Sequence, residues 1–107
     1  MDIRNATRAD RRSGSSLQGY TNLSFKALVE LLGEPDYYDG SDKVYHEWAV
    51  VIEGVLVTVY DYKENGRKAK GYDWHIGGNG RMAVTAFNEL LDYTCQEPAA
   101  RRAYRLA

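Results

Sequence analysis

The stretch VYHEWAVVIEGVLVTVYDY, residues 44–62, decides the fold class of this chain. β-Branched and aromatic residues dominate both of its halves, which is typical of β-strands. Glu53 and Gly54 stand between the halves, and a two-residue turn at this point would fix the pairing of the two strands. The sequence therefore predicts an antiparallel hairpin in which Ile52 faces Val55.

This register sorts the side chains of the hairpin into two faces, because successive residues of a strand alternate. One face is apolar and is expected to lie in the core: Trp48, Val50, Ile52, Val55, Val57 and Val59. The other is mixed and is expected to be half exposed or to contact a partner: Glu47, Ala49, Val51, Leu56, Thr58 and Tyr60.

At the open end of the hairpin the register places His46 opposite Asp61. A carboxylate in this position can orient an imidazole for acid–base catalysis. The same two residues can also form a polar pair across the strands. We favour the structural role, because the sequence places no nucleophile beside them.

Helical patterns flank the hairpin on both sides. SFKALVELLG, residues 24–33, has apolar residues at helical spacing, with Ser24 as the N-cap and Gly33 at the end. YDWHI, residues 72–76, predicts a short third strand, and RMAVTAFNELLDYT, residues 81–94, predicts a second helix.

This order predicts an α+β domain made of a helix, a three-stranded antiparallel sheet with a central β-hairpin, and a helix. Both helices are expected to pack on one face of the sheet. Residues 19–95 would form this single domain. Residues 1–18 are typical of a flexible basic N-terminal tail, and residues 96–107 of a basic C-terminal tail.

The segment WHIGGNGR, residues 74–81, allows two interpretations. Its glycines can supply the positive φ of a tight strand-to-helix turn, with Asn79 as the helix N-cap. The same backbone, with Arg81, can cradle a phosphate of a nucleotide, although the spacing matches neither common nucleotide-binding glycine motif. The ligand-binding residues would then be Trp48, Trp74, His75, Gly77, Gly78, Asn79 and Arg81.

The formal net charge of −1 hides an uneven distribution of charge. Residues 30–62 hold eight acidic residues and one basic residue, and they are rich in tyrosine. Such a surface suits a basic protein partner, because opposite charge steers association and tyrosine gives contact area at low entropic cost. The predicted partner-binding residues are Asp36, Tyr37, Tyr38, Asp39, Asp42, Tyr45, Glu47, Tyr60 and Tyr62.

Other functional classes fit the sequence less well. Two histidines and one cysteine do not make a metal site, and no common catalytic motif is present. The chain has no apolar run of about 18 residues, so no contact with a membrane is expected. We therefore expect a protein that is not an enzyme and has no catalytic residues, no metal and no cofactor.

Three segments resemble a family of small uncharacterised proteins common in the genomes of tailed bacteriophages. They are GYTNLSFKALVELLGEPDYY (19–38), YHEWAVVIEGVLVTVYDYK (45–63) and WHIGG (74–78). The resemblance rests on a Leu-Gly-Glu-Pro helix end, a Glu-Trp strand and a Trp-His-Ile-Gly-Gly turn, and it covers about residues 19–93.

The resemblance implies a phage protein that works in the cytoplasm of the infected bacterial host, and it carries no established activity. Small phage proteins of this kind often bind and block a host protein or an anti-phage defence complex, such as a CRISPR-type or nuclease system. Others sequester a small signalling nucleotide. We expect an accessory protein that inhibits or modulates a host protein or complex, with nucleotide sequestration as the alternative. The aromatic hairpin face would also suit a homodimer.

Overall fold

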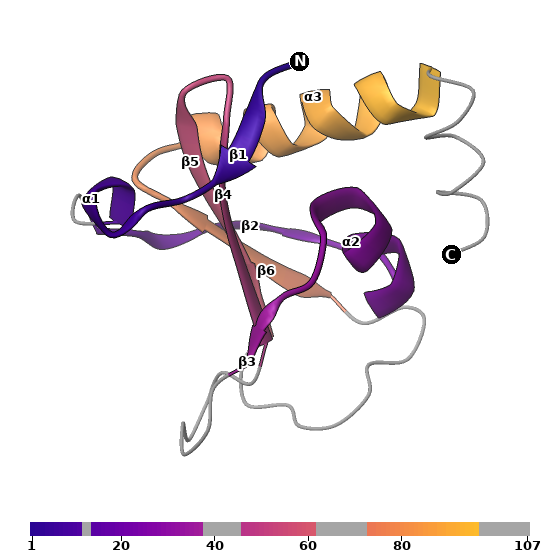
Figure 1. The fold of residues 1–107 in the computed structure, drawn as a ribbon, viewed down its shortest axis with the longest axis horizontal. Coiled ribbons are helices and arrows are strands. Elements are labelled where there is room, and N and C mark those ends of the chain that lie inside the picture. Colours follow the sequence, from indigo (N-terminus) through magenta and orange to yellow (C-terminus); the bar gives the residue numbers. More distant parts are fainter. Residues whose placement is uncertain (12–13, 38–45, 62–72, 97–107) are drawn as a thin grey trace.

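The structure is a computed structural model that describes residues 1–11, 14–37, 46–61 and 73–96. Within these ranges the chain is α+β, with three helices and six strands (Figure 1). In chain order the elements are β1 (Ile3–Asn5), α1 (Arg8–Arg11), β2 (Ser16–Thr21), α2 (Phe25–Leu32), β3 (Asp36–Tyr37), β4 (His46–Ile52), β5 (Val55–Tyr60), β6 (Trp74–Gly78) and α3 (Met82–Gln96).

All strand pairs are antiparallel, and the strand order across the sheet is β1-β4-β5-β6-β2. The two-residue strand β3 pairs with the start of β4, while β1 pairs with its end. The sheet is therefore a path of five strands with β3 added beside β4.

The predicted hairpin is confirmed in its register. Ile52 pairs with Val55, and the pairing continues residue by residue to Glu47 opposite Tyr60. The turn residues Glu53 and Gly54 have φ values of 48° and 81°. Positive φ at both central residues is the mark of the tight turn whose twist matches a two-stranded ribbon.

The core lies on the face of the sheet that α2 and α3 cover. It is a single cluster of buried residues: Leu28, Trp48, Val50, Ile52, Val57, Val59, Trp74, Ile76, Ala83, Ala86, Phe87 and Leu90. Figure 1 shows α3 crossing behind the β4–β5 hairpin with α2 beside it. We call the opposite face of the sheet the second face.

Two tryptophans fasten α2 to the sheet. The indole N–H of Trp48 donates to the carbonyl of Gly33 (2.7 Å), just past the end of α2. The indole N–H of Trp74 donates to the carbonyl of Leu23 (2.9 Å), just before the start of α2. The predicted caps of α2 are also confirmed, since the side chain of Ser24 accepts from the N–H of Ala27 and Gly33 has a φ of 91°.

The predicted architecture of three strands and two helices is wrong. The segment interpreted as a flexible N-terminal tail carries β1, α1 and the first half of β2. Its strands gave no pattern in the sequence, because β1 has three exposed residues and β2 contains a register shift between Leu17 and Gly19. The predicted C-terminal tail lies, apart from its first residue, outside the described residues.

The predicted glycine turn after residue 76 is also wrong, because Gly77 and Gly78 belong to β6. Neither has a positive φ. A Cβ at Gly77 would lie 2.5 Å from the hydroxyl oxygen of Thr58, and a Cβ at Gly78 would overlap the Cβ of Ala83 on α3. These glycines are therefore needed for close packing of the strand and not for a turn.

This packing predicts different costs for two alanine substitutions. Gly78→Ala should lower the free energy of unfolding by about 1–3 kcal/mol, because the added methyl group overpacks the contact between β6 and α3. Gly80→Ala is the matched control, since a Cβ there has no neighbour within 4 Å. Urea denaturation measures both. Equal stability of the two variants would contradict the packing role of Gly78.

Candidate functional site

A row of polar and aromatic residues runs across the second face of the sheet. Strand pairing joins Asp36 to Glu47, Glu47 to Tyr60, Tyr60 to His75 and His75 to Tyr20. Directly opposed residues of antiparallel strands project from the same face of a sheet. The five residues therefore form one continuous surface from β3 to β2, which we call the cross-sheet row.

At the aromatic end of the row, the ring of His75 contacts the rings of two tyrosines. The ring of His75 lies 5.3 Å from that of Tyr60, nearly parallel to it, and 5.0 Å from that of Tyr20, edge to face. Tyr20 is the most exposed of these residues, with 57 % of its surface accessible. Burial lowers the pKa of His75 from 6.5, against a smaller opposing effect of the Asp61 carboxylate. The environment of the ring thus favours the neutral imidazole over the imidazolium.

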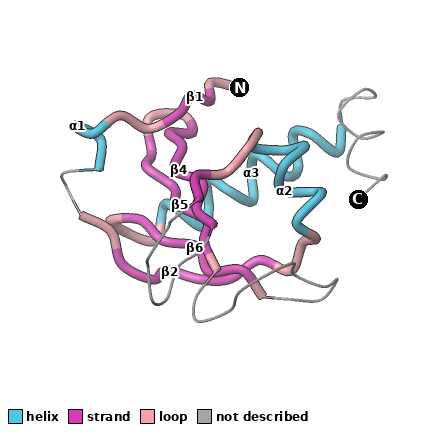
Figure 2. Tube along the Cα trace, turned by 60° about the horizontal axis from the view of Figure 1, so that its bottom comes forward, coloured by secondary structure: helices cyan, strands magenta, loops and turns pink. Residues whose placement is uncertain are grey.

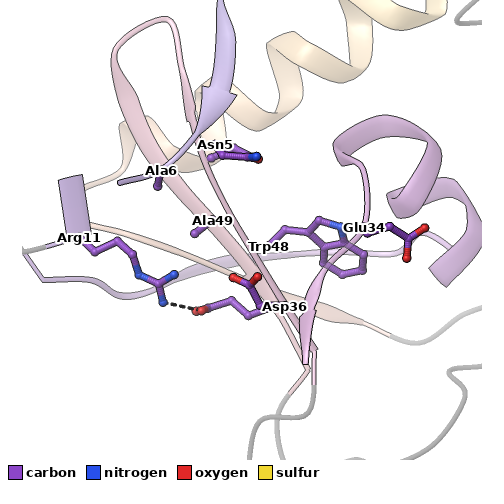
Figure 3. A pocket seen from close by; sticks show the side chains of 9 residues that line it. Asn5, Ala6, Arg11, Glu34, Asp36, Trp48 and Ala49 are labelled. Carbon is purple, nitrogen blue, oxygen red and sulfur yellow. Dashed lines mark hydrogen bonds and ion pairs between the residues drawn. The ribbon is translucent and has the colours of Figure 1, made fainter. Parts of the chain in front are cut away.

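The acidic end of the row opens into a pocket of about 170 Å³ at the edge of β4, between β1 and β3 (Figure 3). Asp36 and Glu47 bring two carboxylates to its lining, and Arg11 of α1 brings one guanidinium. Glu34 also lines the pocket, but its carboxylate points away from it, beyond the ring of Trp48 (Figure 3). An Arg11 Nη2 atom lies 2.6 Å from Oε1 of Glu47. Two acidic groups against one basic group leave the pocket with net negative charge.

The N-terminal segment positions Arg11 through local hydrogen bonds. The hydroxyl of Thr7 accepts from the N–H of Asp10, and the carboxylate of Asp10 accepts from the N–H of Thr7, which together make a capping box at the start of α1. Arg4 adds two hydrogen bonds to the same carboxylate. The Arg4 guanidinium, and then Thr7, hold the pKa of Asp10 well below its usual range.

The predicted opposition of His46 and Asp61 is confirmed, and its geometry fits a structural role. Nδ1 of His46 lies 2.8 Å from Oδ2 of Asp61, and the backbone N–H of His46 donates to Oδ1 (3.1 Å). Asp61 is fully buried, and the ring of Phe25 on α2 packs edge to face against the imidazole. Both carboxylate oxygens therefore hold the first residue of β4, and the pair closes the end of the hairpin beneath α2.

The residues predicted for nucleotide binding are not brought together. Trp48 and Trp74 are buried in the core, and their N–H groups are used by the backbone beside α2. Gly77 and Gly78 are packed inside β6, and His75 projects from the second face. The remaining two residues, Asn79 and Arg81, are exposed near the start of α3.

The residues predicted for partner binding are brought together where the structure describes them. Asp36, Glu47 and Tyr60 are successive members of the cross-sheet row. Tyr37 pairs with His46 through the backbone. The other predicted residues lie outside the described residues: Tyr38, Asp39, Asp42, Tyr45 and Tyr62.

Sequence reasoning missed three contributors to this surface: Tyr20, Arg11 and Glu34. Arg11 lies in the predicted N-terminal tail, residues 1–18, and Tyr20 lies just after it, where no strand is predicted. One signal was present, since Thr7 and Asp10 have the spacing of a capping box, which predicts an ordered helix start before Arg11.

Comparisons with protein-family models, with curated proteins and with solved structures find no match to this chain. Among the described residues, no group of three or more His, Cys, Asp or Glu side chains could hold a metal ion. None of the described helices is long and apolar enough to cross a membrane.

The lowered pKa of His75 predicts a pH dependence of stability. Because the folded state disfavours the imidazolium, the unfolded chain binds more protons once the pH falls below about 6.5, and folding loses free energy there. The free energy of unfolding should therefore fall more in the wild-type protein than in His75→Gln between about pH 7.5 and pH 5.5. Urea titrations at several pH values measure this difference, and a constant difference would contradict the assignment.

Proposed function

We propose that this protein acts by binding another protein through the cross-sheet row and the acidic pocket at its end, and that it is not an enzyme. The observation that carries the proposal is the register that aligns Asp36, Glu47, Tyr60, His75 and Tyr20 on one face. The proposal includes no cofactor, because contact area and charge are sufficient for binding a protein.

The chemistry of the row favours a basic partner. Carboxylates at one end form charge-assisted hydrogen bonds with arginine or lysine. Tyrosine rings at the other end offer flat faces on which a guanidinium can stack. The contact of Arg11 with Glu47 supports this choice, because it places a guanidinium at hydrogen-bond distance within the same pocket.

The resemblance to phage proteins guides the choice of partner. We propose a host bacterial protein or an anti-phage defence complex, such as a CRISPR-type or nuclease system, in the cytoplasm of the infected cell. Complexes that bind nucleic acid carry basic surfaces that neutralise phosphates. An acidic row that ends in aromatic rings could occupy such a surface and inhibit the complex.

Nucleotide sequestration is the less favoured function. Of its seven predicted residues, four are buried in the core or inside β6, and two of these have N–H groups bonded to the backbone. A ligand could contact the exposed residues Asn79 and Arg81. The tryptophans and the glycines of the predicted site would then play no role in binding.

Charge reversal tests the proposal. The double variant Glu34→Lys/Asp36→Lys should weaken binding of the partner at least about tenfold, or about 1.4 kcal/mol, because it places one cation in the pocket and a second at its rim, where the partner brings its own positive charge. The double variant Glu89→Lys/Asp92→Lys on the exposed side of α3 is the matched control, since it changes the net charge by the same amount.

The measurement is quantitative mass spectrometry of proteins recovered with the tagged variants from infected bacteria, followed by titration of the recovered partner. We expect the partner with the wild-type protein and with the α3 control, and its loss with the pocket variant. Equal recovery of the same partner with both double variants would refute the proposed surface.

A further inference from the structure

We propose that a second copy of this chain pairs with the outer edge of β2 and joins the two sheets across a twofold axis. This inference goes beyond the proposed function, and it shares only Tyr20, the last residue of the cross-sheet row, with the surface proposed to bind the partner. Three features of β2 favour a second copy of the chain as the partner: its composition, the exposure of two of its residues, and the face on which both of these residues lie.

Within the part of the chain that the structure describes, no strand covers the outer edge of β2, and this edge is uncharged. β2 ends the strand order, and among the described strands only β6 pairs with it (Figure 2). Its sequence, SLQGYT, has no charged residue and no proline, which are two of the devices that keep edge strands apart. A third such device, a bulge, is present between Leu17 and Gly19. At the other end of the strand order, β1 is half as long and carries Arg4.

Two large side chains of β2 are exposed on one face. Leu17 is 45 % accessible and Tyr20 is 57 % accessible. Residues three apart in a regular strand lie on opposite faces. The register shift between Leu17 and Gly19 removes this alternation, so that Leu17 aligns with Gly77 and Tyr20 aligns with His75 on the second face.

This placement makes the edge self-complementary. Antiparallel pairing about a twofold axis between Gln18 and Gly19 places Leu17 of one copy opposite Tyr20 of the other. By symmetry, the interface contains this Leu–Tyr contact twice. Because both side chains lie on the second face, each leucine packs against a tyrosine ring without a mismatch of faces. The same surface then serves on both copies, as a twofold interface requires.

The local chemistry of the strand favours this approach. The amide of Gln18 donates to the hydroxyl of Ser16 (3.0 Å) and to the carbonyl of Gly78 (3.3 Å), so this side chain folds back onto its own sheet. Gly19 has no side chain at the axis. An interface without charge also lets two copies with net negative charge approach without repulsion at the contact.

Analytical ultracentrifugation from low micromolar to several hundred micromolar protein tests the inference. A six-residue strand buries less than the ~800 Å² per partner of a stable complex, so we expect a reversible dimer that forms as the concentration rises. Leu17→Lys/Tyr20→Lys should remain monomeric. Met82→Lys/Tyr93→Lys is the matched control, because both residues are similarly exposed on α3, and it should dimerise.

Disulfide trapping tests the register. In a Cys95→Ser background, an equimolar mixture of Leu17→Cys and Tyr20→Cys chains should form mixed disulfide dimers faster than either chain forms a dimer with itself. Residues directly opposed across an antiparallel pair have Cβ atoms about 4.5–5.5 Å apart, close enough for cross-linking. Circular dichroism confirms that each variant is folded.

A wild-type protein that stays monomeric at every concentration would overturn the inference. So would a dimer that survives the double lysine substitution on β2, or cross-linking with no preference for the mixed pair. These results do not decide the proposed function, because partner recovery is measured with variants at Glu34 and Asp36, at the end of the cross-sheet row opposite to Tyr20. Failure of the two proposals is therefore distinguishable.

Discussion

The register of β4 against β5 is the constraint on which the rest of the structure depends. A turn of two residues with positive φ sets it, and the alternation of side chains then divides the hairpin into an apolar face and a mixed one, on which Val51, Leu56 and Thr58 are buried. A slip by one residue would place Trp48 in solvent and Glu47 in the core. The core under α2 and α3 and the cross-sheet row on the second face are two results of this one register.

The parts of the fold that follow from local chemistry could be predicted from the sequence. Glu53 and Gly54 specify a tight turn, and Ser24 and Gly33 specify the ends of a helix, because each of these signals acts within a few residues. The strands β1, β2 and β3 carry no such signal. They are short or irregular. β1 and β2 are strands only because they pair with residues far away in the chain, and β3 is two residues that pair with the start of β4.

The candidate site shows the same division. Glu47 and Tyr60 could be placed on one face because the hairpin register reaches them. Tyr20 could not be placed there, because it joins the row through pairing of β2 with β6. The glycines of WHIGG show a second limit, since a sequence does not distinguish a glycine needed for positive φ from one needed for close packing. Gly77 and Gly78 are of the second kind.

The first twenty-one residues occupy both edges of the sheet, with β1 beside β4 and β2 beside β6. Each of these strand pairs joins segments about 45 to 62 residues apart in the chain. The entropy cost of closing such long loops makes these pairs form later than the hairpin. The order of assembly then runs against the order of synthesis, because the hairpin and β6 must be present before the N-terminal strands find a place. Until that step is complete, β4 and β6 have unpaired edges, and the nascent protein is most prone to aggregation in this interval.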